Sequence, residues 1–293
     1  MSAARAQLPE LQRSIDRLAR AVRALRAHRD GATSVVLRQA LLRRGLLWKK
    51  VVHNGCVLPR TRKGRDECYQ LLHHYSFRLF LRDVIKHRQR FGISDLQHYC
   101  SAATARRYLD WLIDRRLVRR TGRRYHLAVD THSFGSTLEW FVASVLEKEY
   151  GIPAVWNVRL DAARGGGDYD VIGFQDGACI YVETKSSPPR NIETRQIHAF
   201  FDRLEALRPQ VAIFLNDTQL RMGDKIAVLF AAELQQRLGR RMQRRRVERL
   251  SGELFTIGGQ VFIANSDPDL ADNLGVCLAH YFRGQGFHMD GGA

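Results

Sequence analysis

The sequence predicts an α/β protein whose second half forms a mixed sheet flanked by helices and whose first half is mostly helical. Two observations support this prediction. From residue 134 to residue 230, short apolar runs alternate with helical periodicity in the order helix, three strands, helix, strand, helix. Before residue 131 the apolar spacing is mainly helical, and positive charge is concentrated there.

The charge distribution suggests that the two halves have different tasks. The chain of 293 residues has a formal net charge of +17. Residues 1–130 contain 29 lysines and arginines against 10 acidic residues, whereas residues 131–293 contain 18 against 20. We therefore expect the first half to contact a polyanion and the second half to carry the chemistry. An arginine-rich genome would explain the scarcity of lysine, but it would not explain the asymmetry.

An apolar seam near the N-terminus predicts a helix that buries one face. Its residues are spaced alternately by three and four positions: Leu8, Leu11, Ile15, Leu18, Val22 and Leu25. A homodimeric coiled coil and a helix packed on its own chain both fit this seam, and we favour the homodimer. A second helix is expected over residues 33–50, and a hairpin over residues 48–58 turned at Asn54-Gly55.

The following region has the element order of a winged helix-turn-helix. We expect a long helix over residues 69–89, a short one after Ser94, a third over residues 102–116 and two strands within residues 118–129. This pattern resembles a winged helix, which implies that the third helix enters the major groove and that hairpin arginines grip phosphates. The candidate nucleic-acid-binding residues are Arg106, Arg107, Arg119, Arg120, Arg123 and Arg124. A protein-binding module of the same shape is the alternative.

A hairpin over residues 165–185 contains the candidate active-site residues. Asp170 opens its first strand, and Glu183 and Lys185 lie two residues apart on its second strand, so both point to one face. Two carboxylates form a hard oxygen site of the kind that Mg²⁺ prefers, and a neighbouring lysine can orient the attacking water. A solvated ion pair is the alternative, but polar groups at the end of a buried strand are costly.

Asp170 is followed, after twelve residues, by Glu183-Thr184-Lys185. This pattern resembles the motif of the PD-(D/E)xK nuclease superfamily, which includes restriction enzymes. Tyr169 replaces the proline of that motif. A helix expected over residues 135–150 carries Glu139 in its first turn and resembles the helix that precedes the motif in the family.

The resemblance implies a restriction-endonuclease-like fold and a DNA endonuclease that depends on Mg²⁺ or Mn²⁺. Asp170, Glu183 and the backbone carbonyl of Thr184 would hold the metal, Lys185 would serve the attacking water, and Glu139 would reach the water shell of the metal. Asp168 shares a strand face with Asp170 and is the alternative ligand. Gln196, on a helix expected over residues 192–207, is a candidate supporting residue.

Three regions are expected: an N-terminal helical region over residues 1–65, a winged-helix-like DNA-binding region over residues 66–131, and a nuclease-like region over residues 132–293. Two other functions fit the same sequence, a nuclease acting on RNA and a winged-helix regulator whose nuclease-like region is not catalytic. The first twenty residues have no signal-peptide core, no apolar run approaches a membrane span, and the five cysteines form no CxxC pair. These features predict a cytoplasmic protein.

Overall fold

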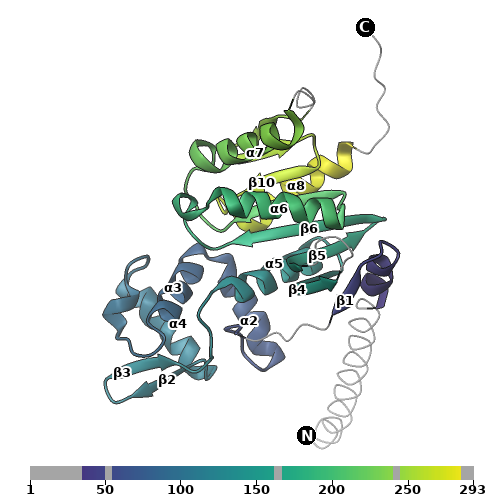
Figure 1. Ribbon diagram of the computed structural model, residues 1–293. Helices are drawn as coiled ribbons and strands as arrows, with labels where there is room; N and C mark the ends of the chain where they lie inside the picture. Colours follow the sequence, from purple (N-terminus) through teal and green to yellow (C-terminus); the bar gives the residue numbers. More distant parts are fainter. Residues whose placement is uncertain (1–34, 50–54, 162–166, 240–244, 285–293) are drawn as a thin grey trace, which may run out of the picture.

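The computed structural model describes residues 35–49, 55–161, 167–239 and 245–284. One large mixed sheet carries helices on its faces, and a helical region with a small hairpin lies beside it (Figure 1). The predicted mixed sheet flanked by helices is therefore confirmed.

Within these residues, eight strands form the large sheet, and in chain order they are Leu47–Lys49 (β1), Ala154–Asp161 (β4), Gly167–Gln175 (β5), Ala178–Lys185 (β6), Val211–Asn216 (β7), Val247–Ser251 (β8), Leu254–Ile257 (β9) and Val261–Ala264 (β10). Their spatial order is β1-β4-β5-β6-β7-β10-β9-β8. β7 runs parallel to β6 and to β10, and the other neighbours are antiparallel. β7 is buried along its whole length, which explains why its sequence is a continuous apolar run.

Different helices cover the two faces of the sheet. α5 (Gly135–Glu149) and α8 (Leu270–Gly284) pack on one face, and α6 (Thr194–Leu207) and α7 (Val228–Leu238) pack on the other. Alternate residues of β6 supply the two cores, because Val182 belongs to the first and Tyr181 to the second.

The helical region beside the sheet contains the predicted order of elements. It consists of α2 (Arg62–His73), α3 (Tyr75–Lys86), a 3₁₀ turn η1 (Ile93–Leu96), α4 (Ala102–Asp114) and the paired strands β2 (Val118–Thr121) and β3 (Arg124–Leu127). The single long helix expected over residues 69–89 is wrong, because His74 is extended, with φ −76° and ψ 116°, and separates α2 from α3. α2 begins at Arg62 because Thr61 caps it, accepting a hydrogen bond from the Gly64 amide at 3.2 Å.

One continuous apolar core joins this region to the sheet. Cys68 of α2, Phe80 of α3 and Leu109 of α4 belong to the same cluster as Phe141 of α5 and Val182 of β6. The boundaries at residues 65 and 131 stay a prediction, and the regions that they separate share buried surface.

Near the N-terminal end of the described chain, residues 35–42 are helical and β1 joins the large sheet. The hairpin expected over residues 48–58 is wrong in its pairing. β1 pairs instead with β4, and Trp48 lies opposite Leu160, 112 positions further along the chain. The seam over residues 8–25 lies outside the described residues, so the homodimer stays a prediction.

The C-terminal elements complete the large sheet. α7 ends at Leu238, and Val247–Ser251 forms the edge strand β8. β9 and β10 form a hairpin, because Gly258 and Gly259 both take positive φ and turn the chain. No helix in the described part of the chain is long and apolar enough to cross a membrane.

Candidate active site

The large sheet has one apolar core under α5 and another under α6. At Asp170, the residues of β4 and β5 that face one core give way to residues that face the other. On one side of it Trp156 pairs with Val171, and both contribute to the core under α5. On its other side Val158 pairs with Tyr169, and both contribute to the core under α6. The strand position opposite Asp170 is Asn157, whose φ of 51° produces the local turn of the strand. The turn separates Asp170 from the regular alternation of β5.

Asp170 is held against β6 by Thr184. Its Oδ2 accepts hydrogen bonds from the Thr184 amide at 2.7 Å and from the Thr184 hydroxyl at 3.1 Å. The amide and carbonyl of one strand residue point to the same edge, so the Thr184 carbonyl also faces β5. These contacts continue the link between the two strands beyond their last backbone pair, Val171 with Val182.

Glu183 is an almost fully buried carboxylate, with 2% of its side chain exposed. The ammonium of Lys185 lies 2.5 Å from its Oε1, and the Arg203 guanidinium donates to both carboxylate oxygens at 3.2 and 3.3 Å. The Tyr181 hydroxyl donates a further hydrogen bond. Two cations therefore offset the charge of Glu183, and the alternation of β6 places Tyr181, Glu183 and Lys185 on one face.

Arg203 is a site residue that the sequence analysis missed. It lies on α6, three residues after the buried Phe200 and four before the buried Leu207. A charged residue at helical spacing from two core positions was the available signal. The residue proposed on this helix, Gln196, acts elsewhere: its Oε1 accepts from the Glu193 amide at 2.8 Å and caps the helix start.

Asp168 is placed away from the contacts that hold Asp170. Its side chain is 65% exposed and forms an ion pair with Arg159 at 3.2 Å. Of the two aspartates, Asp170 is the one that contacts β6 in the structure, so the geometry favours Asp170 over the alternative.

Glu139 lies just after the first turn of α5 rather than within it, and it is close enough to Asp170 and Glu183 for their charges to act on its carboxyl group. Burial raises the pKa of Glu139 to about 8, and the carboxylates of Asp170 and Glu183 act in the same direction. Burial also raises the pKa of Asp170 to about 7, with Glu183 as the next cause and Lys185 opposing it. Three carboxyl groups and one ammonium therefore share this corner of the sheet.

The donor set suits an open metal site better than a closed cage. No group of three or more His, Cys, Asp or Glu side chains is arranged to hold a metal ion within the described ranges. The candidate site offers two carboxylates and a backbone carbonyl, all of them oxygen donors. Mg²⁺ is commonly held by one or two carboxylates and keeps several waters, so the residues fit this ion.

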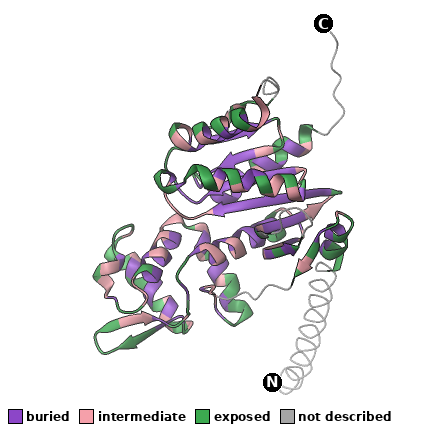
Figure 2. Cartoon of the chain, viewed as in Figure 1, coloured by how far each residue is buried: buried purple, intermediate pink, exposed green. Residues whose placement is uncertain are grey.

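The candidate nucleic-acid-binding arginines lie on the exposed side of the helical region. The two on α4 and the four on the β2–β3 hairpin are all exposed, and the hairpin projects from the molecule (Figure 2). Arg124 forms an ion pair with Asp95 at 3.5 Å, and the Arg120 Nε donates to the Gly122 carbonyl at 2.9 Å. The hairpin is thus a basic projection that carries four exposed arginines.

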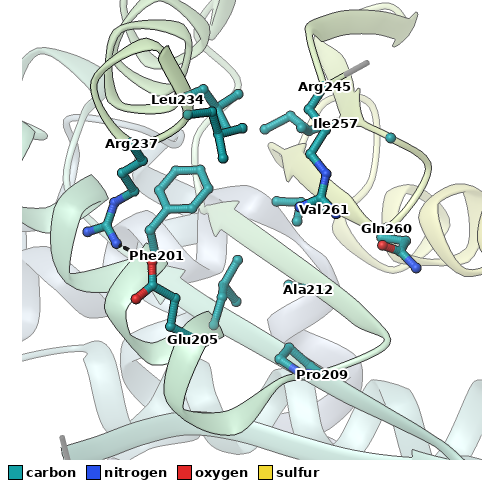
Figure 3. A pocket seen from close by; sticks show the side chains of 13 residues that line it. Phe201, Glu205, Pro209, Ala212, Leu234, Arg237, Arg245, Ile257, Gln260 and Val261 are labelled. Atoms are coloured by element: carbon teal, nitrogen blue, oxygen red, sulfur yellow. Dashed lines mark hydrogen bonds and ion pairs between the residues drawn. The ribbon is translucent and has the colours of Figure 1, made fainter. Parts of the chain in front are cut away.

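A separate cavity of about 540 Å³ lies between α6, α7 and the strands β9 and β10 (Figure 3). Phe201, Leu234 and Ile257 give it an apolar lining. Arg237 at its rim is engaged by Asp202 at 2.6 Å and Glu205 at 2.7 Å. None of the candidate active-site residues lines this cavity.

Comparison with known proteins shows similarity at the level of fold. No protein-family model matches the sequence, and no curated protein matches it. Protein VC1899 from Vibrio cholerae is similar over 86% of this chain and 62% of its own, with a TM-score of 0.51 and 12% identity. Can2 from Sulfobacillus thermosulfidooxidans, solved in complex with cyclic tetra-adenylate, is similar over 83% of this chain and 59% of its own, with a TM-score of 0.44 and 14% identity. The chain spans about three fifths of each of these proteins, and with VC1899 it shares a fold.

Proposed function

We propose that the protein is a metal-dependent nuclease of the PD-(D/E)xK type, which hydrolyses phosphodiester bonds in DNA with Mg²⁺ or Mn²⁺. One observation supports this function most strongly: β5 and β6 bring Asp170, Glu183 and Lys185 together at a corner of the sheet, although Asp170 and Glu183 are thirteen positions apart in the chain. Lys185 keeps its ammonium partly exposed beside the buried Glu183, where it can meet a substrate.

Asp170, Glu183 and the Thr184 carbonyl would hold the metal ion. When bound, the ion would neutralise charge on the scissile phosphate and lower the pKa of its bound water. Thr184 donates to Oδ2 of Asp170 and so orients the carboxylate, whose Oδ1 would be available to a metal ion. Arg203 would fix the orientation of Glu183 through its hydrogen bonds to both carboxylate oxygens, while Glu139 would reach the water shell of the metal.

Lys185 would orient the attacking water and offset negative charge that develops on the phosphate. Its Nζ lies against Oε1 of Glu183 at 2.5 Å, so the ammonium is held at the candidate metal site. Such a preplaced cation stabilises the transition state more than the ground state, because the charge it meets grows during the reaction.

The basic helical region would deliver the substrate. A winged-helix mode of binding would place α4 in the major groove and Arg119, Arg120, Arg123 and Arg124 on flanking phosphates. We propose duplex DNA as the partner, with RNA as the second candidate. We also propose a homodimer through the seam over residues 8–25, because two sites can cut both strands of a duplex.

The proposed metal-binding role of Asp170 is tested by comparing matched substitutions of two aspartates on β5, Asp170 and Asp168. Asp170→Asn is expected to lower cleavage of plasmid DNA by about 10²-fold or more, because a neutral amide is a weak ligand for Mg²⁺. It should also weaken Mn²⁺ binding measured by electron paramagnetic resonance. Asp168→Asn, which removes the same charge two residues away at an exposed position, should leave both properties unchanged. Full activity in Asp170→Asn would contradict the proposed metal site.

The hairpin contact is tested through the salt dependence of DNA binding by the whole chain. The double variant Arg119→Gln/Arg123→Gln should reduce the slope of log K against log salt by about 1.8, since each lost phosphate contact contributes about 0.9. Arg43→Gln/Arg208→Gln removes the same charge from two exposed arginines outside the hairpin and serves as the control. Equal slopes for the two double variants would show that the hairpin does not contact phosphates.

A further inference from the structure

A second cavity, of about 460 Å³, begins one residue beyond the candidate catalytic lysine. Its walls are α3 on one side and the chain segments that follow β6 and β7 on the other, so Ser186 lines it directly after Lys185. The volume lies within the range of small-molecule sites, about 300–1,000 Å³.

The walls of this cavity are fixed to the active-site strand by buried charges. Arg78 and Arg82 of α3 both bind the carboxylate of Asp217, Arg78 at 2.9 Å, and Arg78 is only 1% exposed. The Asp217 amide in turn donates to the carbonyl of Lys185 at 2.7 Å. A ligand in the cavity would therefore be held at a defined distance from Lys185.

The lining combines flat aromatic faces with a few polar groups. Tyr75 comes from α3 and Tyr99 from the loop before α4, while Leu220 follows β7. Tyr99 and Leu220 are 55% and 57% exposed, so a ligand in the cavity could cover their apolar surface. Arg82 and Asp83 add polar atoms, and the buried Nε of Arg82 has no hydrogen-bond partner among the described residues.

Nucleobases match this combination of surfaces. A base presents a π-face that stacks on tyrosine and an edge with donors and acceptors for groups such as Arg82, Asp83 and Ser186. The neighbouring basic region would attract a polyanion, and the adjacent Lys185 would lie near its phosphate. An aliphatic ligand would leave the polar groups of the lining unpaired, which is costly.

We propose that this cavity is a subsite for one nucleobase next to the scissile phosphate, with Tyr99 as its stacking platform. The proposal rests on the proposed nuclease function for its placement. It implies that the bound strand is single, or that one nucleotide leaves the duplex, because a stacked and paired base cannot enter a pocket.

The test measures binding without cleavage, so its outcome is independent of catalysis. The whole protein is titrated, in EDTA, against a 5′-fluorescein-labelled single-stranded DNA of mixed sequence, and anisotropy gives Kd. Tyr99→Ala should weaken binding by about 10-fold, the size of one base–aromatic stack. Tyr99→Phe keeps the ring and should bind as the wild type does. Val276→Ala, which trims another exposed apolar side chain on α8, is the control.

A set of probes, each with one abasic position, locates the base. For the wild type, abasic probes at one position or two adjacent positions should bind about 10-fold more weakly than the rest. For Tyr99→Ala this position dependence should disappear, because the stack is already lost. The proposal is overturned if Tyr99→Ala binds like wild type, or if the position dependence persists in that variant. If Lys185→Ala cleaves normally while the abasic pattern appears, the subsite stands and the proposed nuclease mechanism fails.

Discussion

Lys185→Ala is expected to slow DNA cleavage by about 10²-fold or more, with DNA binding and the fold unchanged. The physical reason is the loss of a preplaced cation that meets charge developing on the phosphate; removal of one such contact typically costs this much in rate. The fold should survive because Arg203 still donates to both oxygens of Glu183. The measurement is a single-turnover nicking rate on plasmid DNA, together with thermal unfolding and a DNA-binding titration.

Lys49→Ala is the matched control for this variant. Lys49 also forms an ion pair with a carboxylate, Asp161, at 2.7 Å, but both side chains are exposed at the edge of the sheet. Its removal should change the rate less than two-fold and the stability by less than about 1 kcal/mol. Cleavage by Lys185→Ala within a few-fold of the wild-type rate would remove Lys185 from the mechanism.

Asp217→Ala is expected to destabilise the protein by about 3–5 kcal/mol, the usual cost of removing one partner from a buried ion pair. Arg78 would be left buried without its carboxylate, and Ser266, whose hydroxyl donates to Asp217 at 2.7 Å, would lose its acceptor. The free energy of unfolding in urea measures the loss. Asp202→Ala removes an exposed carboxylate from Arg237, which keeps Glu205 and Glu233 as partners, and should cost about 1 kcal/mol or less.

The contribution of Asp217 should also depend on pH. Burial acts to raise its pKa, but the charges of Arg78 and Arg82 outweigh burial and hold that pKa below the ordinary value. A carboxylate of this kind stabilises the fold above its unfolded-state pKa, and the stabilisation disappears as the pH falls through the lowered folded-state pKa. The stability difference between wild type and Asp217→Ala should therefore be largest near neutral pH and shrink in acid. A difference that is constant with pH would show that Asp217 acts through packing alone.

Local patterns were sufficient to predict the central hairpin and the candidate carboxylates. β5, the turn at Gly177 and β6 are neighbours in the chain, so strand alternation alone places Glu183 and Lys185 on one face. The helix bearing Glu139 and the order α3, η1, α4, β2, β3 likewise follow from apolar periodicity and capping residues. These features depend on interactions within a few residues, which a single sequence displays directly.

Only the tertiary structure decided which distant groups meet. Arg78 binds Asp217 across 139 positions, β1 pairs with β4 rather than with its neighbour, and Arg203 reaches Glu183 from α6. At Asn157, β4 and β5 change the faces that they bury, and Asp170 there accepts a hydrogen bond from Thr184. The spacing of apolar residues in the sequence did not indicate this change. Periodicity specifies which face of an element is buried, but the partner that buries it depends on chain topology. The sequence by itself therefore predicted Asp170, Glu183 and Lys185 as candidate-site residues, whereas the packing of the elements brought Arg203 to Glu183 and coupled Lys185 to α3.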